Sequence, residues 1–157
     1  MMPAMPHIAF HFNVSDKLHY ACRFVRKALR HDARLTIVAP MAVLRALSPR
    51  LWQQTPHDFL AHAIQGDATE LFALAPVVLV EDAALSPHRD ILLNLGVQLP
   101  HGYEAFARVI EVVSEHDDAD RHQARLRWRS YQIAGFAIER KDLTATGTVN
   151  DNFRENA

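Results

Sequence analysis

Residues 35–39 (LTIVA) and 76–80 (PVVLV) are the two runs that decide the fold. Both are apolar almost throughout, whereas a strand with one wet face alternates apolar and polar residues. A short uninterrupted apolar run is typical of a strand covered on both faces, as in a parallel sheet between layers of helices. The two runs therefore predict a parallel sheet at the centre of the protein.

The segments around these runs alternate between strand and helix patterns. Residues 8–14 (IAFHFNV) predict a first strand, and 91–95 (ILLNL) predict a fourth. Apolar residues at helical spacing predict helices over 17–31, which Ser15 can cap, over 41–52, which Pro49 could end early, and over 103–113. Residues 69–74 suggest a helical turn, and 56–65 an irregular loop. The pattern predicts an α/β three-layer sandwich with a mostly parallel sheet and Rossmann-like topology.

Length and composition fit one soluble domain. The chain has 157 residues, enough for one core, so we expect a single domain over 1–143. After Leu143 the composition turns to Thr, Asn, Gly and charged residues, which predicts a flexible tail over 144–157. No apolar stretch has the length of a membrane helix, the start lacks a signal-peptide pattern, and Cys22 is the only cysteine. A cytoplasmic location follows as an expectation.

The sequence contains no convincing reaction centre. Its five glycines do not form a phosphate-binding loop, so the predicted fold lacks the nucleotide-binding glycine motif. His7 and His11 lie four apart on a predicted strand without a Cys or carboxylate at ligand spacing, so we expect neither metal nor cofactor. Cys22 faces inward on its helix as an inert thiol, and Glu81-Asp82 form a polar turn. We therefore predict no catalytic site.

Residues 117–136 (DDADRHQARLRWRSYQIAGF) predict a binding helix. The acidic start suits the positive end of a helix dipole, and Gly135 stands where helices usually stop. At 100° per residue, five side chains fall within about a quarter of the circumference: Arg121, Arg125, Trp128, Arg129 and Gln132. A wet face rich in arginine is one interpretation of this stripe. Guanidinium groups beside an aromatic ring favour the other, recognition of a carboxylate or phosphate next to an apolar group.

The aromatic residues of 51–62 form a second candidate surface. Trp52 and Phe59, followed by His62, would by default pack into the core. If they are exposed, they would instead anchor a protein partner.

Several of these stretches resemble the chi subunit of bacterial DNA polymerase III holoenzyme. The likeness rests on the first strand with its Cys22-bearing helix, 51–62, 89–92 (RDIL), 111–113 (EVV) and, most specifically, R-x-R-W-R-x-Y-x-x-A-G-F at 125–136. It covers about residues 7–140. The resemblance implies an accessory subunit of the clamp loader, folded like nucleotide-binding domains but without their nucleotide site.

The resemblance also implies partners. In this family, chi binds the acidic C-terminal tail of single-stranded-DNA-binding protein, and the basic positions used for this correspond to Arg121, Arg125 and Arg129, with Trp128 at the aromatic place. Family members also bind the psi subunit, and some bind an accessory helicase. Trp52, Phe59 and His62 resemble that second contact region, although Ala61 stands where the family has a proline.

Two other functions remain open from the residues alone. A small nucleotide binder or enzyme could use the carboxyl ends of the strands, near residues 15–17 and Glu81. Direct binding of single-stranded DNA along the arginine stripe is disfavoured by the net charge of −1. We therefore expect contact with DNA only through a partner.

Overall fold

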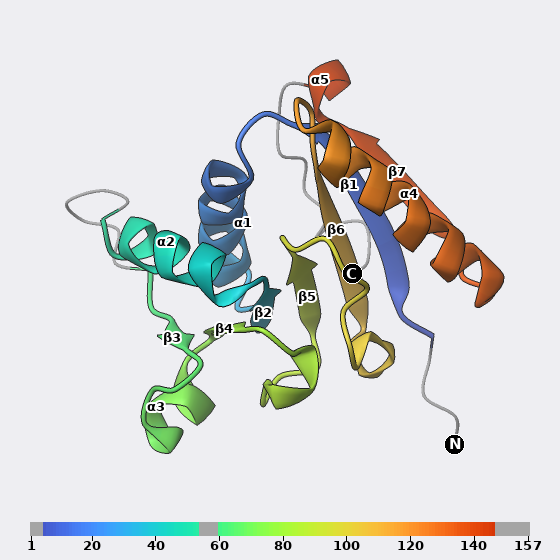
Figure 1. The fold of residues 1–157 in the computed structure, drawn as a ribbon. Coiled ribbons are helices and arrows are strands. Elements are labelled where there is room, and N and C mark those ends of the chain that lie inside the picture. Colours follow the sequence, from blue (N-terminus) through green and yellow to red (C-terminus); the bar gives the residue numbers. More distant parts are fainter. Residues whose placement is uncertain (1–4, 54–59, 147–157) are drawn as a thin grey trace.

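The computed structural model describes residues 5–53 and 60–146, in which seven strands form one sheet with helices on both faces (Figure 1). The strands are β1 (His7–Val14), β2 (Leu35–Val38), β3 (Ala63–Ile64), β4 (Val77–Val80), β5 (Ile91–Asn94), β6 (Arg108–Ser114) and β7 (Ile138–Asp142). Their order is β3-β4-β2-β5-β6-β1-β7, and every pair is parallel. The helices are α1 (Lys17–Arg30), α2 (Met41–Trp52), α3 (Thr69–Leu74), α4 (Asp118–Ile133) and α5 (Leu143–Thr146), with short 3₁₀ turns η1 (Ala83–Leu85) and η2 (Tyr103–Ala105).

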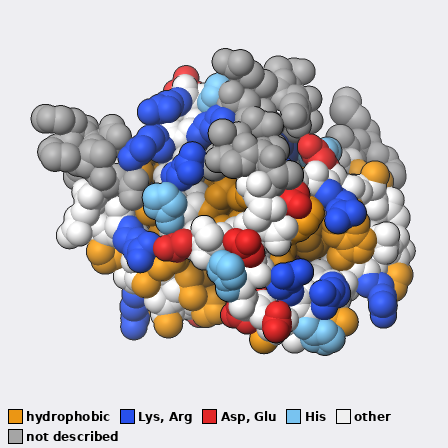
Figure 2. All heavy atoms as spheres, turned by 90° about the horizontal axis from the view of Figure 1, so that it is seen from above, with side chains coloured by type: hydrophobic (Ala, Val, Ile, Leu, Met, Phe, Trp, Pro, Cys, Tyr) orange, Lys and Arg blue, Asp and Glu red, His pale blue; other side chains and the backbone are white. Residues whose placement is uncertain are grey.

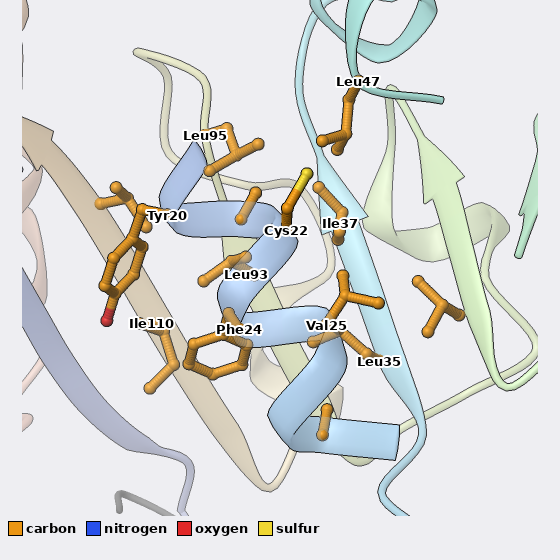
Figure 3. Packing of buried hydrophobic residues seen from close by; sticks show 14 of the residues in the cluster. Tyr20, Cys22, Phe24, Val25, Leu35, Ile37, Leu47, Leu93, Leu95 and Ile110 are labelled. Atoms are coloured by element: carbon orange, nitrogen blue, oxygen red, sulfur yellow. The ribbon is translucent and has the colours of Figure 1, made fainter. Parts of the chain in front are cut away.

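Side chains from the two faces of the sheet enter two separate cores, because successive residues of a strand point to opposite faces. On one face, α1 and α2 cover Ala9 of β1 together with residues of β2, β4, β5 and β6. Tyr20, Cys22, Phe24 and Val25 of α1 lie against the sheet there (Figure 3). On the other face, Phe10 packs with Tyr131 of α4 and with η2. This arrangement confirms the predicted three-layer α/β sandwich.

The runs at 35–39 and 76–80 form the neighbouring strands β2 and β4, and all four residues of each strand are buried. The helices predicted over 17–31 and 41–52 are confirmed as α1 and α2. Ser15 is not the cap of α1, because the carboxylate of Asp16 accepts hydrogen bonds from the amides of Leu18 and His19. Pro49 does not end α2, whose last turn buries Leu51 completely.

The helix predicted over 103–113 is wrong. That segment forms η2 and then the buried strand β6, in which Val109, Ile110, Val112 and Val113 occupy both faces of the sheet. Two further strands were not predicted. The short β3 lies within 56–65, which was expected to be an irregular loop, and β7 forms an edge of the sheet beside β1.

The expected flexible tail over 144–157 lies mostly outside the described residues, and its first residues belong to α5. Within the described ranges, no helix has both the length and the apolar character needed to cross a membrane.

Candidate functional site

The helix predicted over 117–136 is confirmed as α4, and its two ends are fixed by local contacts. The carboxylate of Asp117 accepts a hydrogen bond from the amide of Asp120 at 3.1 Å, so it caps the first turn. Gly135 has a φ of 93°, and the amide of Phe136 donates to the carbonyl of Tyr131 at 3.0 Å. This left-handed glycine ends the helix.

The inner face of α4 is held by a buried polar network around Glu111 of β6. The Glu111 carboxylate accepts hydrogen bonds from Arg127 Nε at 2.8 Å, the Tyr131 hydroxyl at 2.7 Å and the Asn94 side chain at 2.9 Å. Arg127 also donates to the carbonyl of Val97 at 2.7 Å. These directional contacts fix the rotation of α4 about its axis.

Burial raises the pKa of the Glu111 carboxyl, while Arg127 and the two other donors oppose that rise by stabilising the charged form. Burial and then the charge of Glu111 raise the pKa of Tyr131, so its hydroxyl remains a donor. Arg127 is only 3% exposed and therefore belongs to the scaffold, although it lies between Arg125 and Arg129 in the sequence.

The outer face of α4 borders a groove of about 570 Å³ between this helix and the edge of the sheet. We call it the α4 groove. Its lining includes all five residues predicted from the helical stripe: Arg121, Arg125, Trp128, Arg129 and Gln132. The opposite wall comes from β1, β6 and β7: Phe10, Phe12, Asn13, Val113, Ser114 and Arg140. Figure 2 shows Lys and Arg side chains around hydrophobic surface on the side of the molecule that α4 occupies.

The floor of the α4 groove is aromatic. The rings of Phe10 and Trp128 lie 5.0 Å apart, centroid to centroid. The Arg140 guanidinium lies 5.2 Å from the centre of the Phe12 ring and 5.8 Å from that of Trp128. Arg140 was not predicted as a site residue, because only the pairing of β7 with β1 brings it here.

In the part of the chain that the structure describes, the groove is lined by four arginines. Within residues 5–53 and 60–146, Arg125, Arg129 and Arg140 form no ion pair. Arg121 donates one hydrogen bond to the carbonyl of Glu115 at 3.1 Å. Guanidinium groups beside aromatic rings can hold a carboxylate together with a neighbouring apolar side chain.

The second candidate surface is only partly described. Trp52 is 41% exposed at the end of α2, and its ring lies 4.2 Å from that of His62. His62 is buried, with Nε2 at 2.7 Å from the Ser48 hydroxyl and Nδ1 at 2.8 Å from the Leu60 carbonyl. Burial lowers the pKa of His62. The structure thus brings Trp52 and His62 together, while Phe59 lies outside the described residues.

Carboxylates of the protein occupy the helix ends where a nucleotide phosphate would bind. Asp16 caps α1, and a Glu81 oxygen accepts from the amide of Met41, the first residue of α2, at 3.3 Å. The Lys17 ammonium forms an ion pair with the Asp120 carboxylate, with 2.7 Å between Nζ and Oδ1. A phosphate at either helix end would therefore meet a carboxylate of the protein.

His11 and Cys22 are both buried in the protein core. His11 is buried against Tyr20, with its Nδ1 hydrogen-bonded to the tyrosine hydroxyl, and burial lowers the pKa of His11 to about 3. Cys22 is buried and its pKa is raised by burial, which agrees with an inert thiol. Among the described residues, no group of three or more His, Cys, Asp and Glu side chains could hold a metal ion.

Comparison with known proteins identifies the family. The family described as DNA polymerase III chi subunit, HolC, matches residues 5–139. A DNA polymerase III subunit chi from Pseudomonas aeruginosa is 32% identical over 126 residues, which cover 80% of this chain and 85% of that protein. A second protein of the same name, from Haemophilus influenzae, is 29% identical over 97 residues, 62% of this chain and 66% of its own length. The match to the family includes the whole of α4, and the chain belongs to the chi subunits of DNA polymerase III, which are accessory subunits.

Proposed function

We propose that this protein binds the acidic C-terminal tail of single-stranded-DNA-binding protein and links it to the clamp loader during DNA replication. The observation that carries this proposal is the α4 groove, where Arg125 and Arg129 stand beside Trp128 without forming an ion pair within residues 5–53 and 60–146. By resemblance to the family, the tail carries aspartates and ends in Ile, Pro and Phe. Its chemistry complements a cationic groove with an aromatic floor.

The proposed contacts differ in strength. Arg125 would hold the terminal carboxylate as the main anchor, because a planar guanidinium can bind both carboxylate oxygens. Arg121 and Arg129, one helical turn away on either side, would attract the aspartates. Each exposed pair adds only some tenths of a kcal/mol, whereas a desolvated anchor contributes about 2 kcal/mol. We therefore expect weak, salt-sensitive binding.

A second partner, the psi subunit or an accessory helicase, would bind at the exposed Trp52 and at Phe59, and the buried His62 would support the Trp52 ring from inside the protein. Trp52 belongs to α2, on the face of the sheet opposite to α4. The two partners would therefore approach from different sides. In this proposal the protein works in the cytoplasm, has no catalytic role and reaches DNA only through its partners.

Fluorescence anisotropy with a labelled peptide of the tail type, Asp-Asp-Asp-Ile-Pro-Phe, tests the tail contact. Arg125→Ala should weaken binding about 30-fold, the equivalent of about 2 kcal/mol. Arg45→Ala on α2 removes an exposed arginine from the other face and should leave the affinity within twofold. An unchanged affinity in Arg125→Ala refutes the anchor assignment. If the unaltered protein does not bind at low salt, the function itself is refuted.

A further inference from the structure

Arg140 differs from the other arginines of the α4 groove because it comes from the sheet. It lies on β7, and its backbone pairs in register with Phe10 of β1. Neighbouring residues in register share a face of the sheet, so Arg140 projects on the same side as Phe10 and Phe12. It therefore faces α4 across the groove, and the family match ends one residue before it.

The aromatic floor holds the Arg140 side chain in place. Its guanidinium lies 5.2 Å from the Phe12 ring centre and 5.8 Å from the Trp128 ring centre, within the range of a cation–π contact. Rings contact the face of a guanidinium, whereas its N–H donors point outward from the edge. Because Arg140 forms no ion pair within residues 5–53 and 60–146, these donors can serve a ligand.

The position of Arg140 suits one particular chemical group. A terminal carboxylate and the last side chain of a peptide share one residue, so their binding sites must be adjacent. Arg140 is in contact with the aromatic rings that would receive an apolar last side chain. A carboxylate has two oxygens, so it can accept from Arg140 on one wall and from Arg125 on the other.

We propose that Arg140 is a specificity-determining residue of the α4 groove, which contacts the terminal carboxylate of the bound peptide and makes the groove prefer a free C-terminus. This inference rests on the proposed tail-binding function. An internal acidic segment has side-chain carboxylates but no carboxylate beside its last aromatic ring. Such a segment would use the arginines of α4 and gain little from Arg140.

The test compares two forms of Asp-Asp-Asp-Ile-Pro-Phe, one with a free carboxyl terminus and one with an amide. We expect the unaltered protein to bind the free acid at least about tenfold more tightly, in keeping with loss of a charge-assisted contact. Arg140→Gln should weaken the free acid about tenfold and the amide less than twofold. Arg140→Lys, which keeps the charge but loses the planar fork, should recover part of the preference.

A merely structural role gives a different pattern. If Arg140 only packs over the rings, Arg140→Gln weakens both peptides equally or neither, and the inference is overturned while tail binding stands. Arg45→Gln controls for loss of one positive charge and should preserve the preference, and melting curves verify that each variant is folded. If the unaltered protein binds neither peptide, the proposed function fails and this inference fails with it.

Discussion

Glu111→Gln should destabilise the protein strongly, although the two side chains have nearly the same shape. Glu111 is fully buried and neutralises Arg127, which is 3% exposed. A guanidinium cannot lose its proton in this environment, so the variant keeps a buried cation without an anion. Breaking a buried ion pair in this way costs about 3–5 kcal/mol. The glutamine oxygen and the Val97 carbonyl still accept from Arg127, so we expect about 3 kcal/mol.

Removing the other partner should have a smaller and pH-dependent effect. In Arg127→Met the buried carboxyl can take up a proton, because burial already raises the pKa of Glu111. Without Arg127 the folded pKa lies further above the unfolded one, so the folded state binds more protons and stability falls as pH rises. The loss in Arg127→Met should therefore be smaller near pH 5 than at pH 7.

Urea denaturation monitored by tryptophan fluorescence measures both effects, since Trp128 lies on α4. A loss of 3 kcal/mol corresponds to a melting temperature lowered by roughly 6–12 °C. Glu104→Gln, at an exposed position of η2, should stay within about 0.5 kcal/mol of the unaltered protein. A loss below about 1 kcal/mol in Glu111→Gln would show that water reaches Arg127, contrary to the burial of this side chain described above.

Two further effects follow from the backbone and from a buried histidine. The pKa of His11 is about 3 in the folded protein against 6.5 for the free side chain, so the unfolded state binds the proton first. Stability should fall by about 2 kcal/mol between pH 7 and pH 5 on this account, and the slope should flatten in His11→Gln, measured by urea denaturation at each pH. Gly135→Ala should lower the free energy of unfolding by about 1–2 kcal/mol in the same assay, because φ is 93°, a conformation that alanine rarely adopts. The added Cβ meets nothing within 4 Å, so the whole cost comes from the backbone. An unchanged denaturation midpoint would contradict this origin.

Strands β2 and β4 can be predicted from local sequence patterns, whereas strand β6 cannot. The runs 35–39 and 76–80 are buried on both faces, so their composition alone indicates their place. In the segment 103–113, Phe106, Val109, Ile110 and Val113 also match a helical period, and the charge of Glu111 is not typical of a buried strand. That charge is acceptable only because Arg127 neutralises it from sixteen residues away. Such long-range compensation leaves no local pattern in the sequence.

The candidate site shows the same limit. Helical geometry on its own predicts which side chains of α4 share a face, and those five residues line one groove. The opposite wall depends on β7, whose sequence IERKD lacks the apolar character of a typical strand. Arg140 was missed for this reason. Whether the five residues bind a peptide stays a prediction until the binding measurements are made.

The alternation of exposed and buried arginines along α4 limits how this segment can change. Inserting a single residue after Asp120 would rotate the rest of α4 by about 100° about the helix axis. Arg127 would then leave the core, and a different side chain would face the Glu111 carboxylate. Point substitutions on the outer side should be tolerated in folding, but a change of length should not. Relatives of this protein should therefore vary in sequence along α4 while keeping its residue count between Asp120 and Tyr131 constant.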